Sequence, residues 1–282
     1  DAARAYNKTT GAFSHNAVLG YNALDHFNST VGNTRFNVAI GYQALEGGSM
    51  TGTTTENNIA IGYQAVQLTG VNTNTTYQYG IGYRALRSVN GGDYNIAIGA
   101  EAGTNVSTGD YNVFIGHFAG INSAAGNNNT GIGYQAGQRN ATGSNNTSLG
   151  FSALVGSSGN NYSSNTAVGS VALTANTTGN NNTAMGHYAG YSNQTGNNGT
   201  FIGHLAGYST AGSSSNTFLG AYAGRFATSN LNTFVGQGSG ENMTSGSANT
   251  ILGRFNGNDY SLDIRSSSSY LVLSDGNGIP RI

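Results

Sequence analysis

The sequence predicts an all-β fold, a parallel β-solenoid of about fourteen coils. A short motif around one glycine recurs fourteen times in 282 residues, and eight of the thirteen spacings between successive glycines are 17 residues. Residue types alternate with period two around each glycine. A regular repeat of this length is typical of solenoids, and the alternation is typical of strands. The central glycines are Gly20, Gly41, Gly62, Gly82, Gly99, Gly116, Gly133, Gly150, Gly169, Gly186, Gly203, Gly220, Gly236 and Gly253.

Positions within a coil are numbered here from the central glycine, which is position 0. Position −1 is aliphatic or Met in every coil, +3 is Ala in twelve coils, and −3 is Thr in the last eight. Positions −3, −1, +1 and +3 share one face of an extended strand, and −2 and 0 share the other. We therefore expect −3, −1 and +3 to line the interior of each coil, so that Ile98 and Ile115 are core residues.

Glycine and asparagine mark the corners of each coil. Segments such as 177–181 (TTGNN) lie between the strands, and both residue types adopt left-handed backbone conformations and form turns. Position −4 is Asn in twelve coils, with Gln78 and Gly199 as the exceptions. Stacked at ~4.8 Å per coil, these Asn side chains are expected to form a ladder whose amides bond to one another and to the corner backbone.

Composition excludes several classes of protein. Charged residues are 7% of the chain and the net charge is −1, so no basic field is present to bind nucleic acid or an anionic membrane surface. The longest aliphatic run, residues 271–273, is far shorter than the ~20 apolar residues of a membrane-spanning helix. The chain has no Cys, which excludes disulfides and thiolate metal sites. We expect no nucleic-acid partner and no membrane insertion.

The expected interior is only a few methyl groups thick, which is thin for a chain that folds alone. The opposite face carries Gly at position 0 and small or aromatic residues at −2, such as Phe114 and Phe201. Such residues on an outer surface indicate contact with another chain. The prediction is a homotrimer, either intertwined or side by side, with the −2 and 0 face as its interface.

The motif carries a resemblance to known fibrous proteins. Residues 37–45 (NVAIGYQAL) are similar to the left-handed parallel β-roll in head domains of trimeric autotransporter adhesins. The 17-residue form, such as 182–190 (NTAMGHYAG), more closely resembles repeats of bacteriophage tail fibres. Residues 249–257, 262–265 and 273–277 resemble the distal end of such fibres, where the roll leads to a further domain or a cleavable chaperone.

This resemblance implies a left-handed roll and a function. The chain would be a structural and receptor-binding segment of a viral tail fibre, extracellular in the virion tail, that attaches the virion to its bacterial host. Its partners would be two further copies, a host surface glycan or protein, and an adjacent virion tail protein. The alternative is the head of a bacterial trimeric adhesin. We expect residues 1–15 to be a lead-in at a fragment boundary, 16–257 the roll, and 258–282 a terminal β segment.

Catalytic and metal-binding patterns are sparse. A glycan-degrading tail protein, the second alternative, needs two carboxylates about 5–10 Å apart. The 11 acidic residues are scattered, and the closest pair in the sequence is Asp259 and Asp263. We therefore expect no enzyme, no catalytic residue and no cofactor. His187 and His204 occupy position +1 of adjacent coils, which makes them the candidates for a metal site between chains.

Recognition of a surface is the remaining function, and tyrosine is the residue type best suited to it. The chain has 17 Tyr, and rings combined with Asn and Ser can stack on a ligand while the amides form hydrogen bonds. The candidate receptor-binding residues are Tyr77, Tyr79, Tyr94, Tyr111 and Tyr162. The candidate contact loops are the segments that lengthen the repeat: 24–36, 46–57, 67–78 and 155–164.

Overall fold

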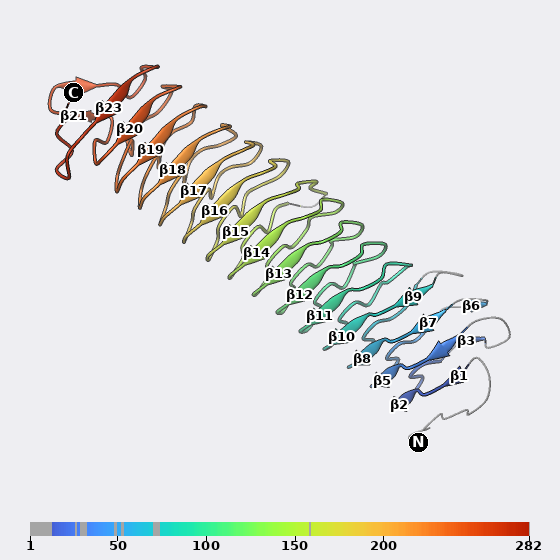
Figure 1. The fold of residues 1–282 in the computed structure, drawn as a ribbon. Coiled ribbons are helices and arrows are strands. Elements are labelled where there is room, and N and C mark those ends of the chain that lie inside the picture. The colour runs from blue at the N-terminus through green and yellow to red at the C-terminus, as the bar shows by residue number, and fades with distance from the viewer. Residues whose placement is uncertain are drawn as a thin grey trace. The chain divides into compact units, whose positions relative to one another are not determined.

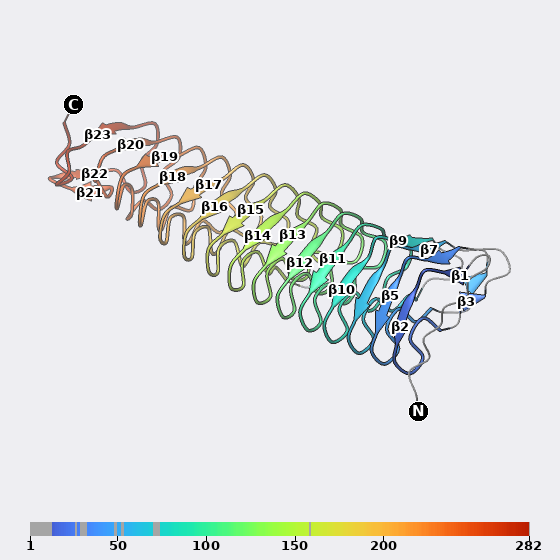
Figure 2. The same ribbon diagram turned by 60° about the horizontal axis from the view of Figure 1, so that its bottom comes forward.

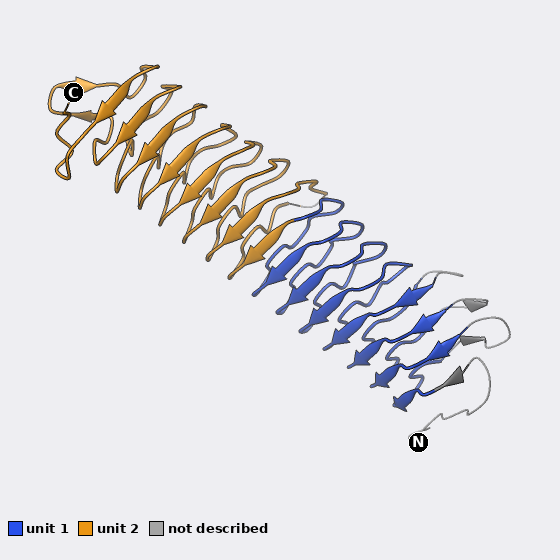
Figure 3. Ribbon diagram, in the orientation of Figure 1, with its two compact units in different colours: residues 1–145 blue, residues 146–282 orange. Residues whose placement is uncertain are grey.

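The structure is a computed structural model that describes residues 13–25, 27–28, 33–47, 50–51, 54–69, 74–157 and 159–281. The chain divides into two compact units, residues 1–145 and 146–282 (Figure 3). Each unit is a stack of parallel β-coils with seven of the fourteen central glycines, and the described residues contain no helix, so none could span a membrane. The predicted all-β parallel solenoid is confirmed.

In unit 1, one three-residue strand precedes each central glycine, and these strands form a parallel sheet in the order β2-β5-β8-β10-β11-β12-β13 (Figure 1). Shorter strands form a second parallel sheet, β1-β4-β7-β9, and β3 pairs with β6. The strands are β1 (Phe13–Ser14), β2 (Ala17–Leu19), β3 (Phe27–Asn28), β4 (Thr34–Arg35), β5 (Val38–Ile40), β6 (Met50–Thr51), β7 (Thr55–Glu56), β8 (Ile59–Ile61), β9 (Thr75–Thr76), β10 (Tyr79–Ile81), β11 (Ile96–Ile98), β12 (Val113–Ile115) and β13 (Thr130–Ile132).

Unit 2 repeats the same arrangement, with its parallel sheet in the order β14-β15-β16-β17-β18-β19-β20-β23 (Figure 2). An antiparallel hairpin of β21 and β22 lies in the chain between β20 and β23. The strands are β14 (Thr147–Leu149), β15 (Thr166–Val168), β16 (Thr183–Met185), β17 (Thr200–Ile202), β18 (Thr217–Leu219), β19 (Thr233–Val235), β20 (Thr250–Leu252), β21 (Asn258–Asp259), β22 (Leu262–Asp263) and β23 (Leu271–Leu273).

The strands pair so that equal positions of successive coils lie side by side. Ile81 at position −1 pairs with Ile98, and Ile98 pairs with Ile115. Within these strands, each side chain therefore lies beside the side chain at the same position of the next coil. This register makes a row of residues at equal positions the structural unit of the fold.

The predicted asparagine ladder is present inside both units. The backbone N–H of Asn129 donates to Asn112 Oδ1 at 2.9 Å, and Asn112 Nδ2 donates to the corner carbonyl of Gly126 at 2.9 Å. Each amide thus satisfies a buried N–H of the next coil and a buried corner C=O. Gly199 interrupts the ladder, but its own N–H still donates to Asn182 Oδ1 at 2.8 Å.

The central glycine is required by close approach of the backbone. At Gly62, φ is +133°, and a Cβ would lie 2.4 Å from the carbonyl oxygen of Gly82 in the next coil. Any side chain at this position would force the coils apart. Gly therefore recurs at position 0 for two reasons: the backbone adopts a positive φ there, and the close spacing of the coils leaves no room for a Cβ.

The prediction of which residues line the interior was right for position +3 and wrong for positions −3 and −1. Positions −2 and +3 are buried, as at Ala97 and Ala102, whereas Ile98 is 39% exposed and Ile115 is only partly buried. The strand ends at the central glycine, where φ is near +130°, so the period-two alternation does not continue to +3. The −2 side chain consequently points toward the turn that carries +3 and +4. The −2 face is the core of each coil and cannot be the predicted interface between chains.

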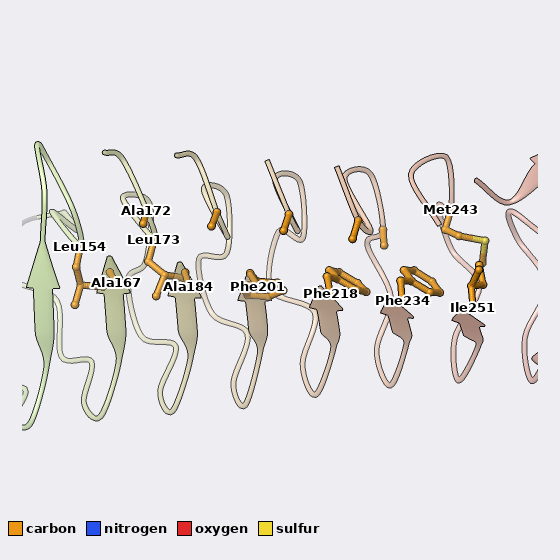
Figure 4. Packing of buried hydrophobic residues seen from close by; sticks show 14 of the residues in the cluster. Leu154, Ala167, Ala172, Leu173, Ala184, Phe201, Phe218, Phe234, Met243 and Ile251 are labelled. Atoms are coloured by element: carbon orange, nitrogen blue, oxygen red, sulfur yellow. The ribbon is translucent and has the colours of Figure 1, made fainter. Parts of the chain in front are cut away.

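The buried side chains at −2 and +4 complement each other in volume (Figure 4). Where −2 is Phe, +4 is Gly: a Cβ at Gly207 would lie 2.4 Å from the ring of Phe201. Where −2 is Ala, +4 can be Leu, as in the pair Ala167 and Leu173, both fully buried. Most coils carry one large side chain at −2 or +4, whereas the coils around Gly99, Gly133 and Gly186 carry none. There the large side chains of neighbouring coils fill the space, as Leu86 and Phe114 do beside Gly103.

Candidate functional site

The tyrosine stack of unit 1 consists of Tyr77, Tyr94 and Tyr111, which occupy position −5 of three successive coils. The ring centroids are 4.8 Å and 4.9 Å apart, and the ring planes are inclined by 9° and 3°. All three phenols are exposed, by 37%, 43% and 57% in chain order. Three of the five candidate receptor-binding tyrosines are therefore brought together in one surface row.

Position −5 is a corner with left-handed backbone geometry, with φ between 57° and 59° at the three tyrosines. Burial of Tyr94 between its neighbours raises the pKa of that phenol, and the adjacent tyrosines and Asp93 act in the same direction. The stack is a row of three stacked, partly exposed phenol rings. Such a row can offer apolar contact and hydrogen bonds together.

Two carboxylates lie beside this stack, at position −6. Asp93 Oδ1 accepts hydrogen bonds from the backbone N–H of Thr76 at 2.6 Å and from its hydroxyl at 3.1 Å. Asp110 Oδ1 accepts from the N–H of Asp93 at 2.8 Å. Burial, aided by the nearby charge of Asp110, raises the pKa of Asp93 despite the bonds from Thr76. These two acids were not among the residues predicted from the sequence to bind a receptor.

The other two candidate tyrosines lie elsewhere. Tyr79, at position −3, is partly buried in strand β10 and makes no ring contact with the stack among the described residues. Tyr162 is fully buried, and its hydroxyl donates to the carbonyl of Leu154 at 2.8 Å. Its ring fills the interior of the 19-residue coil between Gly150 and Gly169, and burial raises the pKa of the phenol. Tyr162 cannot contact a receptor, so that prediction was wrong.

Of the predicted contact loops, only parts are described. Residues 26, 29–32, 48–49, 52–53, 70–73 and 158 lie outside the described residues, so the loops 24–36, 46–57, 67–78 and 155–164 are defined only in part. The first twelve residues of the predicted lead-in also lie outside them.

The candidate metal-binding histidines are neighbours in the structure. The rings of His187 and His204 are stacked, with centroids 5.5 Å apart and planes inclined by 9°. Within the described part of the chain, no group of three or more His, Cys, Asp or Glu side chains could hold a metal ion. A site at these two histidines would therefore need ligands from further chains.

In the acidic pair of the terminal segment, Asp263 forms an ion pair with Arg265. Asp259 and Asp263 lie in the hairpin of β21 and β22, and Arg265 Nη2 lies 2.8 Å from Asp263 Oδ2. This guanidinium lowers the pKa of the Asp263 carboxyl. A carboxyl with a lowered pKa is a poor proton donor, which is the role that glycoside hydrolysis requires of one member of its pair.

A second surface feature is present in each unit and is called here the outward face. It consists of positions −3, −1 and +1. At −1 it exposes aliphatic side chains, among them Leu19, Ile40, Ile81, Ile98, Ile132, Leu149, Met185, Leu219 and Leu252. At +1 of the first four coils, Tyr21, Tyr42, Tyr63 and Tyr83 form a second stack with centroid distances of 5.2–5.6 Å.

Comparisons of the chain with protein-family models, with curated proteins and with solved structures found no match.

Proposed function

We propose that this chain is a structural and receptor-binding segment of a viral tail fibre, in which three copies associate as a left-handed roll and attach the virion to a bacterial host. The resemblance of the repeats to tail-fibre repeats supports the proposal. The structural observation that carries it is the outward face, because this surface is suited to association with further copies of the chain.

The outward face combines exposed aliphatic side chains at −1 with uncharged residues at −3 and +1, where Thr occupies −3 of the last eight coils. From Ala17 to Gln237, positions −3, −1 and +1 contain no Asp, Glu, Lys or Arg. Monomeric proteins rarely expose a contiguous apolar surface of this kind. Burial of apolar area stabilises a complex by roughly 25 cal/mol per Å² before the costs of association.

A second copy of this chain is the occupant that matches the face. Its apolar residues recur once per coil, at the ~4.8 Å spacing of paired strands. A surface that covers this face must have the same spacing to contact every coil. Another copy of the chain has that spacing because it carries the same repeat. Closed rotational symmetry then limits the assembly to a small number of chains, for which the resemblance indicates three.

The mechanism of attachment follows from this assembly. Three parallel chains present three copies of every exposed row, including the tyrosine stack. Contacts that are weak singly then act together, because the first binding event raises the effective concentration of the others. A stiff repeat protein keeps these contacts at fixed spacing.

The first experiment is the solution mass of the protein by light scattering, repeated after dilution. We expect a mass three times that of one chain. Ile98→Asp places a charge on the outward face and should reduce the mass to one chain while the circular dichroism spectrum is unchanged. The matched control is Asn181→Asp, an exposed residue off that face. A wild-type monomer at every concentration would contradict the trimer.

Attachment is tested with fluorescently labelled protein on a panel of bacterial strains. Binding to some strains, lost in the monomeric Ile98→Asp variant, is the expected result. Binding to animal extracellular matrix with none to bacteria would favour the adhesin alternative. Release of new reducing ends from bacterial polysaccharide by the purified protein would favour the glycan-degrading alternative.

A further inference from the structure

Histidine is the residue type of the outward face whose charge changes near neutral pH. We infer that protonation of His117, His187 and His204 separates the associated chains, so that the assembly is stable above about pH 6.5 and dissociates in mild acid. The inference rests on the proposed association of three chains and adds control by pH to it.

The three histidines occupy position +1, in the coils around Gly116, Gly186 and Gly203. All three are exposed in the single chain. In six other coils this position holds Tyr or Phe, a ring of similar size that carries no charge below about pH 9. Histidine therefore replaces a neutral ring in a row that otherwise does not titrate in weak acid.

The rest of the outward face carries no charge. From Ala17 to Gln237, positions −3, −1 and +1 contain no Asp, Glu, Lys or Arg. The face is therefore neutral when its histidines are neutral, and in acid its charge is set by the histidines alone. Three protonated histidines in each of three chains would place nine positive charges on the contacting faces.

In unit 2, two of the histidines are direct neighbours. The rings of His187 and His204 are stacked with centroids 5.5 Å apart, so protonation of both places two like charges side by side within one chain. The other ring contacts of this pair are uncharged. Tyr188 lies 4.2 Å from His187, and Tyr222 lies 5.2 Å from His204, both measured between ring centroids.

The surroundings of the third histidine, in unit 1, are also aromatic. The ring of His117 stacks on Phe118 with centroids 3.8 Å apart and meets the edge of Tyr134 at 5.7 Å. Neither neighbour carries a charge in weak acid. An aromatic environment of this kind offers the imidazolium no negative partner.

No carboxylate compensates the positive charge of these histidines. The ion pairs of the described residues involve none of the three. The charged side chain nearest to His204 through ring contacts is Arg225, whose guanidinium lies 5.5 Å from the centroid of Tyr222. Arg225 is itself a cation, and Glu241 lies 3.4 Å from it as its ion-pair partner. A proton added to the histidine pair therefore remains an unpaired charge.

The direction of the pH effect follows from proton linkage. In the separate chains the three imidazoles are exposed and take up protons near pH 6.5, as histidine side chains in water do. In the assembly their rings lie against uncharged side chains of another chain, where the protonated form loses hydration and gains no partner. The separate chains consequently bind more protons than the assembly. Association is therefore strongest above about pH 6.5, and each histidine that must stay neutral weakens it by up to about tenfold per pH unit below that.

The test measures the solution mass of the whole protein by light scattering from about pH 8 to about pH 5 at constant ionic strength, with circular dichroism as the check on folding. We expect the mass of three chains at the upper pH and of one chain at the lower, with an unchanged spectrum. The triple variant His117→Gln/His187→Gln/His204→Gln should stay associated at the lower pH. Gln is compatible with this position, because Gln237 occupies +1 in the coil around Gly236.

A fixed charge provides the reverse test. His187→Lys is charged at every pH of the titration, and it should weaken association at about pH 8 by tenfold or more. The matched controls are His15→Gln and His15→Lys. His15 is exposed and stacks on an aromatic ring, Phe36 at 5.0 Å, but lies at position −5, outside the outward face. Both control variants should dissociate over the same pH range as wild type.

The outcomes separate this inference from the proposed function. A wild-type protein that stays associated down to about pH 5 would overturn the inference and leave the proposed association in place. Dissociation of the triple Gln variant at the same pH as wild type would assign the transition to other groups and also overturn it. A wild-type monomer at every pH would overturn the proposed association itself.

Discussion

The complementarity of positions −2 and +4 predicts the result of a swap within one coil. Phe218 at −2 is fully buried, and its ring stacks on Phe234 with centroids 5.0 Å apart. Gly224 at +4 has φ +56°, and a Cβ there would lie 2.5 Å from Phe218 Cδ2. The coil around Gly169 uses the reverse pair, Ala167 at −2 and Leu173 at +4. The double variant Phe218→Ala/Gly224→Leu copies that pair.

The magnitudes follow from these contacts. Phe218→Ala leaves a cavity in a tightly packed core and should lower the free energy of unfolding by about 4 kcal/mol. Gly224→Leu alone overpacks the coil against the ring, and with its left-handed backbone it should cost about 4 kcal/mol. Independent effects would total about 8 kcal/mol. We expect the double variant to lose only about 2–3 kcal/mol, because the Leu side chain refills the cavity and only the backbone strain and the lost ring stack remain.

The assay is urea unfolding followed by circular dichroism, at one protein concentration because association shifts apparent stability. The control is the double variant Phe218→Ala/Gly120→Leu. A Leu side chain at Gly120 meets the ring of Phe114 in unit 1, away from Phe218. The destabilisation of this control should therefore equal the sum of the two single variants within about 0.5 kcal/mol. If the double variant Phe218→Ala/Gly224→Leu loses the full sum of the two single effects, the volumes at positions −2 and +4 do not compensate each other and the reasoning is refuted.

Three further substitutions test other features of the coil. Asp93→Asn keeps the acceptor for the Thr76 N–H and removes a carboxylate whose pKa is raised in the folded state. A carboxyl whose pKa is raised on folding stabilises the folded state while it is protonated and destabilises it once it is ionised. The variant should therefore melt at a higher temperature than wild type at pH 7, and at the same temperature below the ordinary pKa of 3.8. An equal difference in melting temperature at both pH values would exclude this cause. Gly62→Ala should cost more than about 3 kcal/mol in urea unfolding, because its Cβ meets the backbone of Gly82, and an unchanged midpoint would contradict the close approach. Asn112→Ala leaves a buried N–H and a buried C=O without partners and should cost about 2–4 kcal/mol, whereas a loss below about 1 kcal/mol would mean that the ladder is dispensable.

The tyrosine candidates show where sequence reasoning worked and where it did not. Tyr77, Tyr94 and Tyr111 share position −5, so aligning the coils on the glycine already places them in one row. Tyr162 lies in a lengthened coil. There the number of residues from the central glycine no longer predicts the direction of a side chain. The structure turns it inward, because the longer segment leaves interior space that the ring fills.

By itself, the sequence determined the repeat, the strand before each glycine, the parallel stack and the asparagine ladder. These follow from spacing and from local chemistry, which a linear pattern records directly. The inside and the outside of the coil were decided only by the tertiary structure. Both faces of the strand are apolar, and hydrophobicity alone favours Ile98 over Ala97 as the core residue. The structure buries the smaller residue, because the coil is narrow and its strand ends at a glycine that redirects the chain. The pairing of Phe at −2 with Gly at +4 was the one signal in the sequence that pointed to this core.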